Sequence, residues 1–293
     1  MQGDRTRLDE GIHFERSGNL QEALEVYESV ANTAKDPALV AESLRRKSTV
    51  YRQKCAWDSA LKAARASAQT ALRAEKPELF AEALNAEAAV YLSRGDFIAA
   101  QPLLQQILSI VTDHRILGIA HQNLGNIAAQ GGDFASAKGH FRESRDHFRR
   151  AGYRRGEAIS LINQSANAND MSDYDDALAA AQDAVAAARE VGDYELLALA
   201  SLNHAEALAG LERFVEAEEL ASQALGFFGI EGNRYRQVSC LRVLGDINRK
   251  QERFANAVRC YERALKLAEG IDAQVERTRL ENRLAELEDI TAA

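Results

Sequence analysis

The stretch that decides the fold is LGNIAAQGGDFASAKGHF, residues 124–141, in which four positions form a spaced pattern. A small residue, Gly125, is followed by a Gly-Gly break, an aromatic residue, Phe134, and a second small residue, Ala137. Asp133 lies directly after the break, where its carboxylate can accept hydrogen bonds from the free N–H groups of a new helix. The stretch therefore predicts two helices joined by a tight turn.

The same pattern recurs along the chain at intervals of 37 or 40 residues. The alanine recurs as Ala23, Ala60, Ala100, Ala137, Ala177, Ala217 and Ala257. Three positions earlier lies a bulky residue: Leu20, Trp57, Phe97, Phe134, Tyr174, Phe214 or Phe254. Twelve positions before the alanine the residue is small: Gly11, Ser48, Ala88, Gly125, Ser165, Ala205 or Gly245. We expect the two small positions to face each other, so that paired helices approach closely.

These columns resemble the tetratricopeptide repeat (TPR), in which a small residue in a first helix, an aromatic near the turn and an alanine in a second helix recur. The units are mostly 40 residues long instead of about 34, as in kinesin light chains and bacterial peptide-sensing regulators. The resemblance implies an all-α fold, a right-handed α-solenoid of about seven TPR hairpins. We expect one array over residues 1–293, with units starting near residues 4, 41, 81, 118, 158, 198 and 238.

A C-terminal capping helix is expected over residues 272–290. There Leu280, Leu284 and Leu287 form one apolar stripe while the other faces are charged, as in a helix that closes an array. Ala285 lies 40 residues after Gly245 and so continues the small column.

The composition excludes several functional classes. Lys and Arg number 36 against 44 Asp and Glu, and the net charge of −8 repels a polyanion at long range. The three cysteines, Cys55, Cys240 and Cys260, form no CxxC pair, which fits a reducing compartment. We expect Cys240 and Cys260 to be small buried apolar residues. Because the first residues lack the apolar core of a signal peptide and no run of eighteen apolar residues occurs, we expect a cytoplasmic protein without a membrane partner.

The motifs of catalysis are missing from the sequence. There is no Gly-rich phosphate loop, HExxH or GxSxG, so we predict no enzyme activity and no cofactor. Four histidines, His114, His121, His140 and His147, gather in the fourth unit. Pairs seven residues apart on one helix lie about 10 Å apart, which is too far to share a metal ion. Only an approach of His121 and His140 between helices would change that, and we predict no metal site.

The TPR resemblance implies that the first helix of each unit lines a concave groove that holds the ligand. Asn123, Asn163 and Asn203 occupy equivalent positions in consecutive units, two residues before the small column. A carboxamide pairs with both the N–H and the C=O of an extended peptide, and kinesin light chains and peptide-sensing regulators resemble this chain in using such amides. The other predicted groove residues are Gln122, Asn126, Gln130, Asn169, Arg45, Arg46, Arg52, Arg242 and Arg249. Alternatively, the asparagines bond to adjacent helices and stabilise the array.

Hydrogen bonds from a row of amides do not bind a peptide by themselves, so side-chain pockets must contribute to the affinity. Four apolar residues of the same helices are either anchors for a ligand or core residues: Ile159, Ile162, Leu199 and Leu202. The arginines favour an acidic ligand unless Glu82, Glu206 and Asp246 neutralise them.

The sequence thus predicts a non-catalytic scaffold or adaptor that binds an extended peptide or a protein segment in its groove. One alternative is the sensor portion of a larger bacterial regulator. Another is nucleic-acid binding through the run Arg142–Arg155, where six arginines alternate with Phe148 and Tyr153. A charged, solvated helix face explains the same run.

Overall fold

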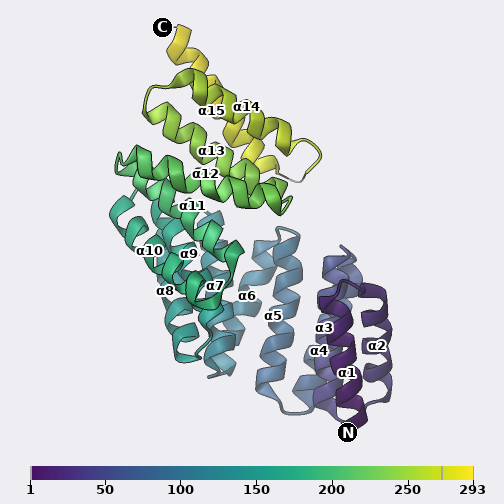
Figure 1. The fold of residues 1–293 in the computed structure, drawn as a ribbon. Coiled ribbons are helices and arrows are strands. Elements are labelled where there is room, and N and C mark those ends of the chain that lie inside the picture. Colours follow the sequence, from purple (N-terminus) through teal and green to yellow (C-terminus); the bar gives the residue numbers. More distant parts are fainter. Residues whose placement is uncertain (1, 272, 293) are drawn as a thin grey trace. The chain divides into compact units, whose positions relative to one another are not determined.

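The computed structural model describes residues 2–271 and 273–292, and within them every regular element is a helix (Figure 1). Asp272, the predicted start of the capping helix, lies outside the described residues. The helices are α1 (Gln2–Arg16), α2 (Leu20–Thr33), α3 (Pro37–Gln53), α4 (Trp57–Arg73), α5 (Pro77–Ser93), α6 (Phe97–Ile110), α7 (His114–Gln130), α8 (Phe134–Arg150), α9 (Arg154–Asp170), α10 (Tyr174–Val191), α11 (Tyr194–Gly210), α12 (Phe214–Ile230), α13 (Arg234–Lys250), α14 (Phe254–Ala268) and α15 (Gln274–Ala292).

The repeat columns coincide with seven helical hairpins, which confirms the predicted all-α repeat fold. Each even-numbered helix from α2 to α14 begins at the bulky residue of its unit. The seven alanines that follow by three positions are fully buried, and so are the seven small residues of the odd-numbered helices. We refer below to α1, α3, α5, α7, α9, α11 and α13 as the A helices, and to the even-numbered helices as the B helices.

Each hairpin turn contains one residue in the left-handed backbone region, two positions before the B helix. These residues have φ between 55° and 80°, and they are Gly18, Cys55, Gly95, Gly132, Ser172, Glu212 and Glu252. Asp133 caps α8 as predicted, by accepting from the N–H group of Ser136, and Asp96 caps α6 in the same way by accepting from that of Ala99. Asp173, at the equivalent position of the fifth unit, makes no capping bond and lies 3.6 Å from the ammonium of Lys138.

Replacing Glu252 with glycine is expected to stabilise the protein by about 0.5–1 kcal/mol. Glu252 is exposed with φ 58°, and a β-carbon in this region costs about 1–2 kcal/mol, part of which the greater freedom of glycine in the unfolded chain cancels. Urea denaturation measures the change. Glu262→Gly, at an exposed position inside α14, is the matched control and should instead cost about 1 kcal/mol. A loss of stability in both variants would contradict the prediction.

The close approach of paired helices differs from the prediction in its partner. A β-carbon added at Gly245 would lie 2.2 Å from the ring of Tyr261, four residues after the column alanine, and one added at Gly11 would lie 2.6 Å from the ring of Tyr27. In these two units the small residue of the A helix therefore makes room for this later side chain, whereas in the fifth unit the hydroxyl of Ser165 donates to the carbonyl of the column alanine, Ala177, over 2.9 Å. The sizes of the two positions are complementary. Gly11 and Gly245 belong to units with a tyrosine four residues after the column alanine, whereas Ser165 and Ala205 belong to units with an alanine at that position.

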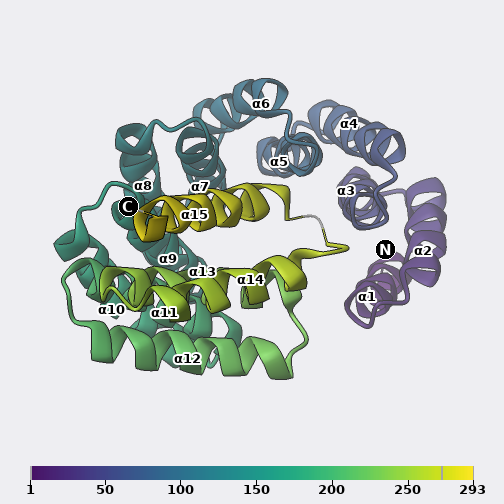
Figure 2. The same ribbon diagram turned by 90° about the horizontal axis from the view of Figure 1, so that it is seen from above.

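The helices form two compact units, Met1–Gly132 with Asp146–Gly152, and Asp133–Arg145 with Tyr153–Ala293, so that α8 is divided between them. Within each unit, successive A helices contact one another, as α9 does α11 and α11 does α13 (Figure 2). Each of the B helices α2, α4, α6, α10, α12 and α14 contacts A helices, and in these described segments none of the six contacts another of them. The A helices therefore form the inner layer of each unit. The single array predicted over residues 1–293 remains a prediction.

The core is divided into clusters that each combine an A helix, its B helix and the next A helix. One cluster joins Leu202 and Leu208 of α11 to Phe228 of α12 and to Val243 and Ile247 of α13. Because α9, α11 and α13 each take part in more than one cluster, the hairpins of the second unit are stabilised by their neighbours, as in other repeat proteins.

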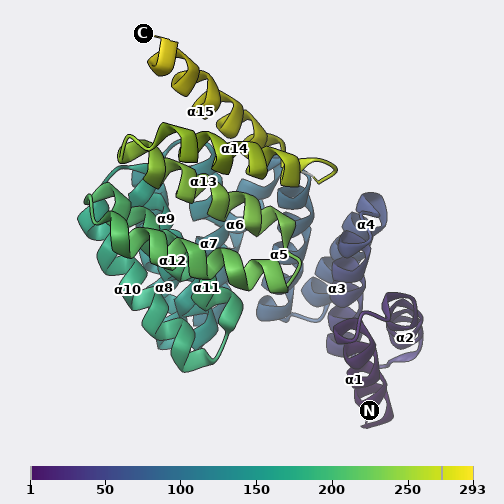
Figure 3. The same cartoon turned by 45° about the horizontal axis from the view of Figure 1, so that its top comes forward.

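Helix α15 contacts α14 and α13 at the C-terminal end of the second unit (Figure 3). Leu280 and Leu287 are fully buried against these helices and Leu284 is partly buried, which confirms the predicted stripe. Ala285 is exposed, so the small column does not extend into α15. The reason is that the leucine stripe faces α14 and turns Ala285 away from it.

Candidate functional site: the inner layer of A helices

The predicted asparagine column lies on the A helices, and its members differ in how they are bonded. The amide nitrogen of Asn203 on α11 donates to the carbonyl of Ile162 on α9 over 2.9 Å, and Asn169 donates back to the carbonyl of Asn203. In the first unit, Asn123 donates to the side-chain oxygen of Asn85 over 3.2 Å. For Asn123 and Asn203 the structure thus shows the helix-to-helix bonding that the sequence left as an alternative.

Asn163 on α9 differs from the other two asparagines. It is half-buried and forms no hydrogen bond with any described residue. Asn203 also retains an amide oxygen with two free lone pairs, since its bond to Ile162 uses only the nitrogen. The A helices of the second unit therefore offer the complete carboxamide of Asn163 and, on Asn203, the amide oxygen and one N–H. Gln122, Asn126 and Gln130 on α7 form no hydrogen bonds among the described residues, and Gln130 is exposed.

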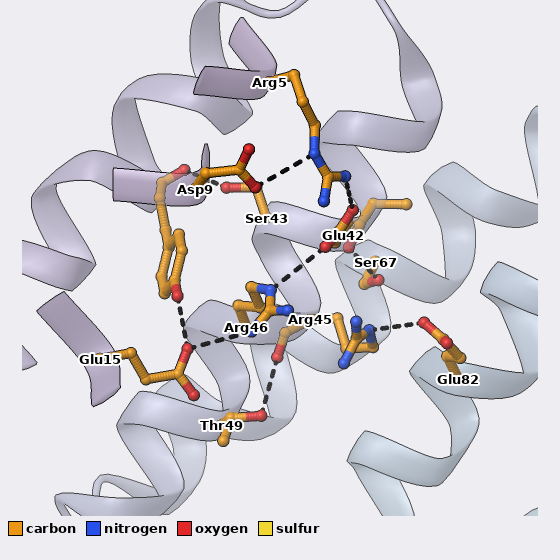
Figure 4. A network of polar contacts seen from close by, with 12 residues as sticks. Arg5, Asp9, Glu15, Glu42, Ser43, Arg45, Arg46, Thr49, Ser67 and Glu82 are labelled. Carbon is orange, nitrogen blue, oxygen red and sulfur yellow. Dashed lines mark hydrogen bonds and ion pairs between the residues drawn. The ribbon is translucent and has the colours of Figure 1, made fainter. Parts of the chain in front are cut away.

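The predicted arginines of the first unit are mostly occupied by carboxylates (Figure 4). Arg46 lies 3.4 Å from Glu42 and 3.5 Å from Glu15, and Arg45 lies 3.0 Å from Glu82. Arg52 donates to the hydroxyl of Ser93 over 3.4 Å. Because most of their charge is neutralised locally, these arginines give no basis for an acidic ligand.

The second unit contains a cavity of about 450 Å³ between its inner A helices and α15. Arg242, Arg249 and Asn169, three of the predicted groove residues, line it. Its other charged lining residues are Asp170, Glu206, Asp246, Lys250, Arg279, Arg283 and Glu286. The volume is within the range of small-ligand sites.

Ion pairs fix the wall of this cavity, which we call the α13–α15 cavity. Arg242 lies 3.1 Å from both Glu206 and Asp246 and 3.4 Å from Glu276 of α15. Burial alone would lower the pKa of the guanidinium, but the three carboxylates outweigh it and raise that pKa. Arg283 of α15 lies 3.1 Å from Asp246, which also accepts a hydrogen bond from the hydroxyl of Tyr261.

Two charges in the α13–α15 cavity have no ionic partner among the described residues. Asp170 forms no hydrogen bond or ion pair, and desolvation, followed by the charge of Glu206, raises its pKa against the opposing charges of Arg279 and Arg242. Lys250 donates to the carbonyl of Ala209 over 3.2 Å and lies 5.0 Å from the ring centre of Tyr174, but it meets no carboxylate. Both side chains line the cavity, and both are exposed.

Sequence reasoning missed the contribution of α15 to this cavity. Its leucine stripe indicated a cap, and no role was predicted for the charges of its other faces. A signal existed, because Glu276, Arg279, Arg283 and Glu286 follow a spacing of three, four and three residues, which places four charges on one helix face.

Burial decides between alternatives that the sequence left open. Ile162 and Leu202 are buried core residues, and Ile159 and Leu199 are packed against the same clusters, so none of the four is a free anchor. Cys240 is buried as predicted, which raises its pKa to about 12, while Cys260 is only partly buried.

The basic run Arg142–Arg155 lacks one of its two predicted stacking rings. Phe148 is buried, and a β-carbon on Gly118 would lie 2.7 Å from its ring. Arg154 and Arg155 lie 2.9 Å and 3.0 Å from Glu157 and Asp193.

The histidines meet in a pairing that the sequence did not predict. The Nδ1 atoms of His114 and His147 are 2.9 Å apart, and His121 stacks on His147 with 5.6 Å between ring centres. Across residues 2–271 and 273–292 there is no group of three or more His, Cys, Asp or Glu side chains arranged to hold a metal ion.

Comparison with known proteins identifies the repeat. The tetratricopeptide repeat family matches residues 79–150, 115–190 and 196–270, which together span more than half of the chain. The chain belongs to the tetratricopeptide repeat family. The recurring small, bulky and alanine positions are therefore those of a TPR.

Solved structures with the same TPR fold are distant in sequence. A signal transduction ATPase with numerous domains and a tetratricopeptide repeat sensor, from Pyrococcus horikoshii, is 12% identical with a TM-score of 0.74 over 98% of this chain. This chain spans only 44% of the length of that protein. The quorum sensor NprR from B. thuringiensis is 14% identical with a TM-score of 0.72, covering 92% of this chain and 77% of the other.

A Rap protein complexed with competence and sporulation factor is 15% identical with a TM-score of 0.68, covering 96% of this chain and 80% of the other. No curated protein matches the chain in sequence. Within the part of the chain that the structure describes, no helix has the length and apolar character needed to cross a bilayer.

Proposed function

We propose that this TPR protein is a non-catalytic scaffold or adaptor that binds an extended peptide or protein segment along the A helices of its second unit. The observation that carries the proposal is the half-buried carboxamide of Asn163, which has no partner among the described residues, one repeat before the free amide oxygen of Asn203. The amide atoms of Asn163 are not buried from water, so a bound peptide backbone would replace their hydrogen bonds to water at a net gain of about 1 kcal/mol each.

The bonding of Asn203 supports a specific role for that residue. One N–H of its amide is held by a main-chain carbonyl, which fixes the side chain, so its oxygen can accept from a peptide N–H and its second N–H can donate. Asn163 can both donate and accept, and so can pair with an N–H and a C=O of the same peptide. Two amides of this kind fix the direction of an extended segment without reading its side chains.

The energies show that the amides alone do not hold a ligand. Each hydrogen bond contributes about 1 kcal/mol net, whereas ordering a peptide costs about 1–2 kcal/mol per residue. Because Ile162 and Leu202 belong to the core, the additional contacts must come from polar and charged groups. The α13–α15 cavity on the same unit supplies them.

Asn163→Leu tests the proposal. Peptides of twelve residues are first selected from a displayed random library for binding to the wild-type chain. The Asn163→Leu variant is expected to bind these peptides at least tenfold more weakly, a loss of about 1.4 kcal/mol in binding free energy. Gln182→Leu, which exchanges an exposed amide on the outer helix α10, is the matched control and should leave affinity unchanged. Equal affinities for wild type and Asn163→Leu, with both variants folded by circular dichroism, would contradict the proposal.

The sensor portion of a larger regulator is a second candidate function. The observation that favours it is that this chain spans only 44% of the protein with a tetratricopeptide repeat sensor whose fold it shares. The gene's complete reading frame decides this candidate, because an effector domain encoded in the same frame would support it.

A further inference from the structure

The α13–α15 cavity has a charge distribution that restricts its ligand. Five basic and four acidic side chains line it, and a fifth carboxylate, that of the buried Glu276, pairs with Arg242 behind the wall. The lining with this carboxylate is therefore neutral overall. A neutral cavity with fixed charges discriminates by the arrangement of a ligand's charges and not by their sum.

Most of these charges are already used by the protein. Arg242, Arg279 and Arg283 each lie within 3.4 Å of at least one carboxylate, and Arg249 lies 3.9 Å from Glu286. Only Asp170 and Lys250 remain without an ionic partner among the described residues. They are opposite in sign, and they do not pair with each other although both line the same cavity.

We infer that the α13–α15 cavity binds a short zwitterionic peptide with both ends free, its α-ammonium on Asp170 and its α-carboxylate on Lys250. This inference rests on the proposed function and specifies the ligand. Asp170 lines the cavity and its side chain is exposed, so a ligand's ammonium ion can reach this carboxylate and form a charge-assisted hydrogen bond with it. Lys250 uses one of its three N–H donors on the carbonyl of Ala209 and keeps two for a carboxylate.

Ligands with a single charge fit this arrangement less well. An anion that pairs with Lys250 leaves Asp170 unpaired, and a cation that pairs with Asp170 leaves Lys250 unpaired. A segment in the middle of a longer protein carries neither terminal charge. The cavity thus favours a free short peptide over an internal protein segment.

Tripeptides with defined ends test the inference. Four pools of random tripeptides are prepared: one with free termini, one acetylated at the amino end, one amidated at the carboxyl end, and one with both modifications. Native mass spectrometry of the complete chain measures which peptides of each pool bind. The most enriched sequence is then titrated by calorimetry in all four forms. The free form is expected to bind, and blocking either end is expected to reduce affinity at least tenfold.

Two charge variants assign each end of the peptide. In Asp170→Asn the effect of acetylation should disappear while that of amidation persists, and Lys250→Gln should show the reverse. The matched controls Asp175→Asn and Lys266→Gln change exposed charges outside the cavity lining and should retain both effects.

The outcomes separate this inference from the proposed function. It is overturned if no tripeptide binds, if the doubly blocked form binds as tightly as the free form, or if neither charge variant alters the effect of blocking. Longer peptides that still bind with dependence on Asn163 would then leave the proposed function standing. Loss of both would remove the proposed function as well.

Discussion

Gly245→Ala is expected to destabilise the C-terminal hairpin by about 2–3 kcal/mol, the upper range for overpacking a filled core. The new β-carbon would lie 2.2 Å from the ring of Tyr261, which is fully buried. The ring cannot retreat easily, because the hydroxyl of Tyr261 donates to Asp246 over 2.7 Å. Native-state hydrogen exchange of α13 and α14 measures the loss locally, which suits a repeat protein whose units open separately.

The matched control is Gly226→Ala in α12. This glycine also lies inside a helix, but an added β-carbon meets no atom within 4 Å. Alanine is favoured over glycine in a helix, so this variant should gain up to about 1 kcal/mol. If Gly245→Ala were as stable as the wild type, the size complementarity between the small column and the later B-helix residue would be wrong.

Arg242→Met is expected to lower the free energy of unfolding by about 3–5 kcal/mol, which is the usual effect of removing one partner from a buried ion pair. The guanidinium is the shared counter-charge of three carboxylates on three helices, and Glu276 is almost fully buried. Its removal leaves like charges facing one another around the cavity wall. Urea denaturation of the variant, with hydrogen exchange of α15, measures the effect.

Arg253→Met provides the control for this prediction. Arg253 pairs with Glu218 at 3.3 Å, and both side chains are about half exposed. An exposed pair is worth at most about 1 kcal/mol, so the same substitution should have little effect there. Equal losses in both variants would mean that Arg242 does not organise the contact of α13 with α15.

The hairpins were predictable because their determinants are local and repeated. The bulky residue marks the start of each B helix, and the column alanine is buried in every unit, so seven independent occurrences support one another. Left-handed turn residues are less regular in sequence, since Ser172 and Glu252 adopt a backbone region where glycine is the usual signal.

The candidate site was less predictable, because hydrogen bonds between repeats depend on helix placement. The equivalent residues Asn163 and Asn203 read alike in sequence, yet only Asn203 reaches a main-chain carbonyl of the neighbouring helix. The charges of α15 reach Arg242 and Asp246 across more than thirty residues of chain, and no local pattern gives that distance.

The central claim, that a peptide lies along the inner layer of the second unit, is tested most directly by cross-linking. A selected twelve-residue peptide carrying a photoreactive phenylalanine analogue at its centre is irradiated with the wild-type chain, and the adducts are located by mass spectrometry. The account predicts adducts on α9, α11 and α13, including residues next to Asn163. Adducts confined to the outer helices α10 and α12 would contradict it.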